Sequence, residues 1–327
     1  MSIRSTRGLT VAAFTCFAAS VGVSISHAQE YPNRPIRLII PYPPGGPTDF
    51  VGRTVAQEMT KGLGQQVVVD NRAGAAAMIG HELGAKAAPD GYTLLFATGG
   101  GMVIAPLVAP KPAYDAAKDF SAISMLVISP QIIVAHPSLP ANNIKELIAA
   151  AKAKPNFYNF ASVGIGSPNH LGGELLKVMT GIDIVHVPYK GTSPAITDLI
   201  AGQTQFMFPS LFTALPHVRS GKLKALAVAG PKRSALFPDV PTLKELGIDI
   251  EYAVNRGLLA PKGTSAEVLG KLRSACATAA KDPGFEKTMK NFGTVVRYLD
   301  HKGYTAFLKK NDALNKQIAK ELGLLKR

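Results

Sequence analysis

The first third of the chain alternates short apolar runs with segments of helical periodicity. Apolar runs over Ile36–Pro41, Gln66–Asp70 and Thr93–Thr98 predict three strands, the first of them buried. Between them, apolar residues recur at helical spacing over Thr48–Lys61 and Ala76–Ala87, which predicts two helices. Strands and helices that alternate in this order are typical of a parallel sheet with helices on both faces.

The rest of the chain continues the alternation, without an internal repeat or a low-complexity linker. Predicted strands cover Phe120–Val127, Gln131–His136, Phe160–Ser162, Ile184–Val187, Gln205–Phe208, Ala225–Ala229 and Leu258–Ala260. Predicted helices cover Asn143–Ala153, His170–Thr180, Pro194–Ala201, Leu243–Leu246, Ser265–Lys281, Phe285–Phe292 and Tyr304–Leu322.

The length of 327 residues exceeds what one hydrophobic core usually holds, so we expect two lobes. Because no linker separates them, strands should cross from one lobe to the other, near Val127–Val134 and Ala225–Gly230. The first lobe would then comprise residues 29–127 and 229–327, and the second lobe residues 128–228. A cleft between two such lobes is a natural ligand site.

Residues 1–28 have the features of a cleavable signal peptide. Arg4 and Arg7 precede an apolar stretch over Leu9–Val23, and Ser26-His27-Ala28 resembles a cleavage site. The apolar stretch is shorter than the roughly 20 residues that a membrane span needs, and no later segment is long and apolar enough. We therefore expect a secreted protein that is soluble once the signal peptide has been removed.

The charge balance favours anionic partners only weakly. Without Arg4 and Arg7, 34 of the 36 basic residues remain against 22 acidic ones, a net charge of +12. The basic residues are spread out and form no aromatic-interleaved motif, so we expect no nucleic-acid partner. A cationic surface helps to attract small anions, but it identifies no site.

The cysteine count excludes several kinds of chemistry. Cys276 is the one cysteine left after removal of the signal peptide, so no intramolecular disulfide, zinc site or dithiol chemistry is possible. It lies in a helical pattern and is interpreted as a small buried residue. We expect no metal and no cofactor.

Three loops share a composition suited to binding an anion. The segments Pro43–Asp49, Ser162–Pro168 and Tyr189–Pro194 each follow a predicted strand and open a helix. Helix starts leave N–H groups unpaired, and glycine lets the backbone approach a ligand. In these loops Thr48 or Asp49, Ser167, and Thr192 or Ser193 are the candidate capping residues, listed by loop. Ordinary strand–helix turns have the same composition, so a shared anionic ligand and purely structural turns have equal weight.

Searches for catalytic motifs find none. The chain lacks a complete dinucleotide fingerprint, a Walker A motif and a nucleophile elbow. Its histidines are scattered, with His170 expected to pack or bond locally and His186 expected in the core. We therefore expect a protein that is not an enzyme.

The motifs of the chain, taken together, resemble those of the substrate-binding proteins of tripartite tricarboxylate transporters, the Bug receptor family. The resemblance covers nearly the whole chain after residue 30, in order. The matching motifs are Tyr31-Pro32-Asn33-Arg34-Pro35-Ile36, Pro43-Pro44-Gly45-Gly46-Pro47-Thr48-Asp49, Val69-Asp70-Asn71-Arg72-Ala73-Gly74-Ala75, Pro89-Asp90-Gly91-Tyr92-Thr93, Gly164-Ile165-Gly166-Ser167-Pro168-Asn169-His170, Val187-Pro188-Tyr189-Lys190-Gly191, Leu215-Pro216-His217 and Pro238-Asp239-Val240-Pro241-Thr242.

The resemblance implies an α/β fold of the type II-like periplasmic-binding-protein class, with two Rossmann-like lobes joined by crossing strands. It also implies a monomer that closes on a small carboxylate and presents it to a membrane permease. Family members hold carboxylates largely through backbone N–H groups and water. Carried onto this chain, the contacts would be Pro44, Gly46, Thr48, Asp49, Thr98 and Gly99 in the first lobe, and Ser162, Gly164, Gly191 and Thr192 in the second.

Two departures from the family pattern bear on the ligand. Pro209-Ser210 stand where the family commonly has an Asp that pairs with a ligand amine, which makes an amino acid less expected. Arg256 stands where the family often has an aromatic residue, and it could pair with a second carboxylate or simply lie at the surface. A di- or aromatic carboxylate is the resulting hypothesis, with Phe208 and Phe212 as stacking candidates that may equally be core residues.

Two other functions remain open from the sequence. A sensory receptor that passes a signal to a membrane partner needs the same closing lobes as a transport receptor. A secreted enzyme acting on a small acid would need a nucleophile and a base within hydrogen-bond reach, and the sequence offers no persuasive pair.

Overall fold

The computed structural model describes residues 30–108, 113–250 and 252–321. The chain divides into two units after Tyr31, and the fold below is that of the second unit, Pro32–Arg327, within its described residues. The predicted signal peptide lies outside the described residues.

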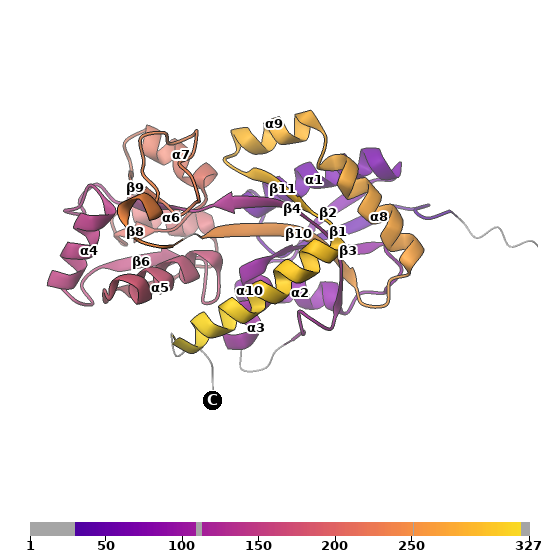
Figure 1. The fold of residues 1–327 in the computed structure, drawn as a ribbon, viewed down its shortest axis with the longest axis horizontal. Helices are drawn as coiled ribbons and strands as arrows, with labels where there is room; N and C mark the ends of the chain where they lie inside the picture. Colours follow the sequence, from indigo (N-terminus) through magenta and orange to yellow (C-terminus); the bar gives the residue numbers. More distant parts are fainter. Residues whose placement is uncertain (1–29, 109–112, 251, 322–327) are drawn as a thin grey trace, which may run out of the picture. The chain divides into compact units, whose positions relative to one another are not determined.

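One mixed sheet of six strands forms the centre of the first lobe (Figure 1). Its strand order is β11-β4-β10-β3-β1-β2. β1 pairs in parallel with both β2 and β3, which confirms the parallel start predicted from the sequence, whereas β10 pairs antiparallel with β3 and β4, and β11 antiparallel with β4. The bounds are β1 Ile36–Ile40, β2 Val67–Asn71, β3 Thr93–Thr98, β4 Phe120–Pro130, β10 Ala253–Pro261 and β11 Val295–Leu299.

Helices cover both faces of this sheet. A Cβ on Gly52 of α1 would lie 3.1 Å from Phe96, and one on Gly84 of α2 would lie 3.1 Å from Leu95, which points to the opposite face of the same strand. Helix α8 packs against α1, and α10 packs against α3. The bounds are α1 Pro47–Leu63, α2 Met78–Ala85 after the short turn η1 Ala75–Ala77, α3 Gly99–Val108, α8 Ala266–Ala279, α9 Pro283–Asn291 and α10 His301–Glu321.

A second sheet of five strands, in the order β7-β6-β8-β5-β9, forms the centre of the second lobe (Figure 1). β6 pairs in parallel with β7 and β8, and β5 pairs antiparallel with β8 and β9. The strands are β5 Ile132–Ala135, β6 Asn159–Ser162, β7 Val185–Pro188, β8 Phe206–Met207 and β9 Lys224–Val228. The helices are α4 Ile144–Ala153, α5 Pro168–Thr180, α6 Thr192–Ile200, α7 Leu211–Arg219 and the short η2 Lys244–Leu246.

Two strand segments connect the lobes. The outward crossing runs from β4 through Gln131 into β5, as the sequence predicted. The return crossing is at Tyr252 and Ala253, where β10 begins, whereas the predicted crossing Ala225–Gly230 is wrong because β9 lies within the second sheet. The crossings are joined by a hydrogen bond from Gln131 N to Tyr252 O (3.3 Å), and Tyr252 N donates in turn to Ala229 O (2.6 Å), just after β9.

The core of the second lobe extends beyond β9. Leu243 and Ile250 are buried in the same apolar cluster as Ile133, Phe160 and Phe206 of the second sheet. The lobe boundary at residues 228 and 229 remains a prediction, and this packing favours a later one.

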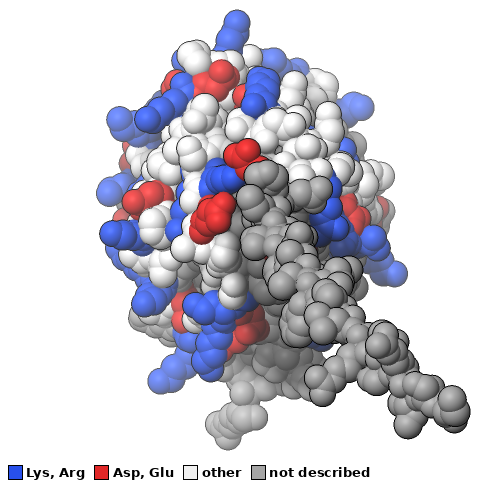
Figure 2. Space-filling view, turned by 90° about the vertical axis from the view of Figure 1, so that its right-hand side faces the viewer, with Lys and Arg blue, Asp and Glu red and all other residues white. Residues whose placement is uncertain are grey.

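Cys276 is a free cysteine with no exposed area, as predicted, and burial raises the pKa of its thiol to about 12. Figure 2 shows basic side chains interspersed with acidic and uncharged ones on the face that it displays. None of the helices within residues 30–321 that the structure describes is long and apolar enough to span a bilayer.

Candidate functional site

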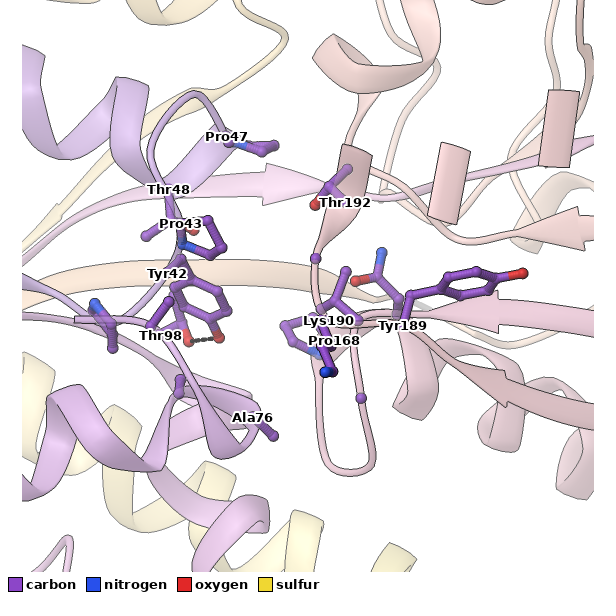
Figure 3. A pocket seen from close by; sticks show the side chains of 18 of the residues that line it. Tyr42, Pro43, Pro47, Thr48, Ala76, Thr98, Pro168, Tyr189, Lys190 and Thr192 are labelled. Carbon is purple, nitrogen blue, oxygen red and sulfur yellow. Dashed lines mark hydrogen bonds between the residues drawn. The ribbon is translucent and has the colours of Figure 1, made fainter. Parts of the chain in front are cut away.

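A cavity of about 720 Å³ lies between the two lobes (Figure 3). First-lobe loops after β1, β2 and β3 form one wall, and the starts of second-lobe helices form the other. Ten of the predicted site residues line it: Pro44, Gly46, Thr48, Thr98, Gly164, Gly191, Thr192, Pro209, Ser210 and Arg256.

Four helices begin at the cavity. The first turns of α1, α5, α6 and α7 all contribute lining residues. Ser167 and Ser210 cap α5 and α7 by accepting the N–H groups of His170 and Thr213. The N-caps of α1 and α6 are Gly46 and Gly191, neither of which provides a side-chain cap. These two helix starts, one from each lobe, therefore retain backbone N–H groups for a ligand.

This arrangement corrects part of the sequence prediction. The cap of α5 by Ser167 with Pro168 at the first helical position is as predicted. Thr48 and Asp49 do not cap α1, because Pro47 already occupies the first turn and Gly46 is the N-cap. Thr192 likewise lies inside α6. The fourth helix start, at α7, was not predicted as a helix from the sequence.

Asp49 lies outside the cavity lining and holds the loop before α1. Its carboxylate accepts hydrogen bonds from Gly45 N (3.0 Å), Asn71 Nδ2 (2.8 Å) and Arg53 Nε (3.0 Å). Burial alone would raise the pKa of Asp49, but these hydrogen bonds outweigh it and lower the pKa below its usual value. The carboxylate therefore positions the glycine-rich loop rather than facing a ligand.

Arg256 is the cation of the first-lobe wall. Its side chain is only 3% exposed, and it donates from Nε to Thr48 Oγ1 (3.1 Å) and from Nη1 to Ser129 Oγ (2.6 Å). Burial lowers its pKa to about 10, with the Tyr42 hydroxyl opposing the shift. Among the described residues no carboxylate pairs with it, so three of the five N–H donors of a guanidinium have no protein partner.

The cavity is electropositive. Arg256 and Lys190 line it, and none of its described lining residues is an Asp or Glu. Lys190 comes from the second-lobe loop before α6 and faces the gap between the lobes in Figure 3. A buried cation without an acidic neighbour is costly, because desolvation is not compensated. The wall is therefore suited to an anion that supplies the missing partner.

Tyr42 and Thr98 add neutral polar groups to the same wall. Their hydroxyl oxygens are 2.8 Å apart and joined by a hydrogen bond, drawn in Figure 3. Burial raises the pKa of Tyr42, so the phenol stays protonated and serves as a donor or an acceptor. Tyr42 was not among the predicted site residues, although it directly precedes the proposed anion-binding loop Pro43–Asp49.

A strained turn borders the first-lobe side. Ala75, Ala76 and Ala77 have φ values of 48°, 53° and 79°, a conformation that L-residues rarely adopt in succession. All three line the cavity. A Cβ built on Gly164 of the second lobe would be 3.8 Å from the Ala76 methyl, so these residues approach each other across the cleft.

Ser162 and Gly99, which were predicted contacts, also lie behind the lining. Ser162 has no exposed area, and its Oγ accepts from Gly164 N (3.0 Å) and contacts His186 Nε2. This gives a serine–histidine pair that the sequence did not reveal, but the serine has no access to a cavity ligand. Gly99 starts α3, where an added Cβ would collide with Asn255.

Two histidines behind this wall are held neutral. Burial lowers the pKa of His170 to about 3 and that of His186 to about 4. The centroids of their two rings are 4.2 Å apart, and His170 stacks on the core residue Phe160. Local packing of His170 agrees with the sequence interpretation.

The two phenylalanines suggested as stacking partners do not line the cavity. Phe208 is fully buried in the second-lobe core. Phe212 of α7 stacks on Phe292, with ring centroids 3.4 Å apart, and Phe292 stacks in turn on Phe50 of α1 at 3.9 Å. These rings join the two lobes outside the cavity, so the stacking hypothesis is wrong.

Several lining residues were not predicted from the sequence. Gln131, Asn169 and Thr213 bring neutral hydrogen-bonding side chains to the cavity, and Lys190 brings a charge. Asn169 and Lys190 lie inside motifs that carried the family resemblance, so a signal for them existed. Within the described part of the chain, no three His, Cys, Asp or Glu residues cluster as metal ligands would.

Comparison with known proteins places this geometry in context. Residues 51–324 match the family model described as Tripartite tricarboxylate transporter family receptor. The fold is similar to the periplasmic binding protein BugD, with a TM-score of 0.84 and 36% identity, covering 91% of this chain and 100% of that one.

Two solved relatives contain acids. Rpa4515 of R. palustris with adipate is 30% identical, with a TM-score of 0.85, and the match covers 90% of this chain and 98% of that one. MatC from Rhodopseudomonas palustris with bound malate is also 30% identical, with a TM-score of 0.81 and coverage of 88% and 99%.

Proposed function

The chain belongs to the tripartite tricarboxylate transporter receptor family, and from this premise we propose that it captures a small di- or aromatic carboxylate between its lobes. The loaded receptor then delivers its ligand to the membrane subunits of a transporter of this type. It acts in the periplasm, to which the predicted signal peptide directs it.

The observation that carries this proposal is the guanidinium of Arg256, which has no carboxylate partner among the described residues. Arg256 is almost completely buried, lines the cavity, and donates hydrogen bonds to hydroxyl groups rather than to a carboxylate. A carboxylate supplies both the negative charge and the bidentate acceptor geometry that a guanidinium fork prefers. The uncapped starts of α1 and α6 add favourable interactions for a second anionic group.

The lining also supports a diacid over an amino acid. A ligand ammonium group would enter a cavity that already holds Arg256 and Lys190 and, among its described lining residues, no carboxylate. Like charges in a site of low dielectric repel strongly. A diacid neutralises both cations, whereas a zwitterion neutralises one and opposes the other.

The test is thermal unfolding of residues 29–327 with a panel of acids. The panel holds adipate, malate, succinate, citrate, phthalate, benzoate, glutamate and glutamine. At about 100 times its dissociation constant, a ligand adds about 2.7 kcal/mol to the free energy of unfolding, which raises the midpoint by several degrees.

The matched pairs in the panel decide the outcome. Stabilisation by diacids but not by benzoate supports a ligand with two carboxylates, and stabilisation by phthalate and benzoate alike supports an aromatic acid. Stabilisation by glutamine in preference to every diacid would contradict the proposal. Absence of any shift with the whole panel, confirmed by calorimetric titration, would also contradict it.

A further inference from the structure

Gln131 occupies an unusual position in the cavity. It is the residue that joins β4 to β5 where the chain crosses between the lobes, and it is 2% exposed. Its backbone is fixed on both sides, because Gln131 N donates to Tyr252 O of the return crossing and Gln131 O accepts from Ala229 N at 2.8 Å. The side chain therefore extends from a firmly held backbone into the cavity that it lines.

The side-chain amide of Gln131 has no hydrogen-bond partner among the described residues. Its amide atoms are not among the fully enclosed side-chain atoms without a partner, so they open onto the cavity and present two donors and an acceptor there. Buried polar side chains in native proteins are overwhelmingly hydrogen-bonded, so an unpaired one that faces a cavity indicates a partner that enters from outside. The site of Arg256 accounts for anions but not for this amide.

The strand geometry places Gln131 close to that anion site. Ser129, which accepts from Arg256, lies two residues earlier, and side chains at such spacing point to the same side of a strand. Two residues of strand span roughly 7 Å. A ligand whose carboxylate pairs with Arg256 thus carries its neighbouring atoms toward Gln131.

Asn169 adds a second acceptor from the opposite lobe. It is 9% exposed, lines the cavity, and donates from Nδ2 to Phe208 O at 2.5 Å. Its Oδ1 therefore remains as an acceptor without a partner among the described residues. The acceptors of Gln131 and Asn169 both require a donor, and a carboxylate at neutral pH has none.

Resting on the proposed function, we infer that Gln131 is a specificity-determining contact that reads a neutral hydroxyl group on the bound acid. The ligand is a hydroxycarboxylate: its carboxylate pairs with Arg256, and its hydroxyl donates to the Gln131 amide oxygen and accepts from the amide nitrogen. An ammonium group is disfavoured as the donor, because the described lining residues include two cations and no carboxylate.

Calorimetric titration with hydroxy and deoxy acids of matched skeleton tests the inference. The pairs are malate and succinate, citrate and tricarballylate, and mandelate and phenylacetate. We expect the wild-type receptor to bind the hydroxy member of at least one pair about 5- to 150-fold more tightly, since a deoxy acid leaves the buried amide unpaired.

The variant Gln131→Met keeps the side-chain length and removes the hydrogen bonds, so the preference should fall to within threefold. Gln131→Leu serves as a second variant if Gln131→Met unfolds below the titration temperature. The matched control is Gln203→Met, because Gln203 is exposed and lies outside the cavity lining. The control should retain the full preference.

The outcomes separate the two proposals. A deoxy acid that binds as tightly as its hydroxy partner, or a preference that survives both Gln131 variants, overturns the role of Gln131 and leaves the carboxylate receptor standing. If no acid of any pair binds the wild-type protein, the inference fails, whereas the proposed function fails only if adipate, phthalate and benzoate give no shift or heat either.

Discussion

Replacing Arg256 with methionine should separate ligand binding from folding. The change removes the guanidinium but keeps a flexible side chain of similar length inside the cavity wall. Truncating one partner of a buried, hydrogen-bonded charge pair typically costs 2–5 kcal/mol. The dissociation constant of a bound diacid should therefore rise about 30- to several thousand-fold.

The stability of the ligand-free protein should change by a smaller amount, because two opposing effects act on it. Burial lowers the pKa of Arg256 from 12.5 to about 10, so at every pH below about 10 the charged side chain destabilises the fold by about 3 kcal/mol. The methionine variant regains this amount. It loses two hydrogen bonds, to Thr48 and Ser129, which are worth about 1.5–3 kcal/mol each. The two effects nearly cancel, so we expect the free energy of unfolding to stay within about 3 kcal/mol.

Urea unfolding without ligand and calorimetric titration with the best acid of the panel measure the two quantities. Arg256→Lys keeps the charge but loses the planar fork, so its affinity should fall between those of wild type and Arg256→Met. The control is Arg273→Met, since Arg273 donates to Ala122 O and lies outside the cavity lining. Diacid binding by Arg256→Met within threefold of wild type would refute the reasoning.

Two further predictions concern closure and pH. Gly191 has an extended φ of 170°, and a Cβ there would lie 3.7 Å from Pro43 Cγ across the cleft. Titration of Gly191→Ala should therefore show normal ligand binding. Gly191→Val should bind the ligand at least tenfold more weakly, because its branched methyl groups would contact Pro43. Equal affinities of the two variants would contradict this. Burial lowers the pKa of His81 to about 4 and that of His170 to about 3, so below the ordinary value of 6.5 the unfolded chain takes up protons that the folded chain does not. Urea unfolding should therefore show that the free energy of unfolding decreases as the pH is lowered from 7 to 4.5, by up to about 1.4 kcal/mol per pH unit for each histidine. A free energy of unfolding that stays constant over that range would contradict this.

The sequence predicted the order of the elements where local patterns and tertiary packing agree. The apolar runs of β1 and β3 are buried, and that of β2 is rich in valine, so the local pattern located all three strands. Helix α3 was missed because it starts with Gly99 and contains Pro106, both poor helix formers. The missed strand β11, with the sequence VVRYL, did carry a local signal. Helix α7 was missed as well, since it is short and includes Pro216.

The site shows a similar division between local and long-range information. Helix starts rich in glycine and proline were visible as loops, and three of them reach the cavity. The strand β10 was predicted from Leu258, five residues too late, because Asn255, Arg256 and Gly257 are not typical strand residues. Their burial depends on partners far away in the chain, such as Thr48, which lies 208 residues from Arg256. No local pattern contains that pairing, so Arg256 was left between a ligand contact and a surface residue.

The distribution of contacts also determines what a ligand must do to close the receptor. The lobes already touch where Phe212 stacks on Phe292 and Phe50, and each of these two aromatic pairs adds about 0.5–1.5 kcal/mol to the association of the lobes. Arg256 and its hydroxyl partners Thr48 and Ser129 belong to the first lobe and its crossing strand, so an acid held by them alone binds open and closed forms equally.

A ligand shifts a conformational equilibrium only by its difference in affinity for the two states. That difference must come from groups that reach the ligand when the lobes meet, namely the start of α6 at Gly191 and the acceptor of Asn169. A simple monoacid satisfies Arg256 and leaves these groups unpaired. An acid with a second polar end bridges the two walls, and it is this bridging that couples binding to closure.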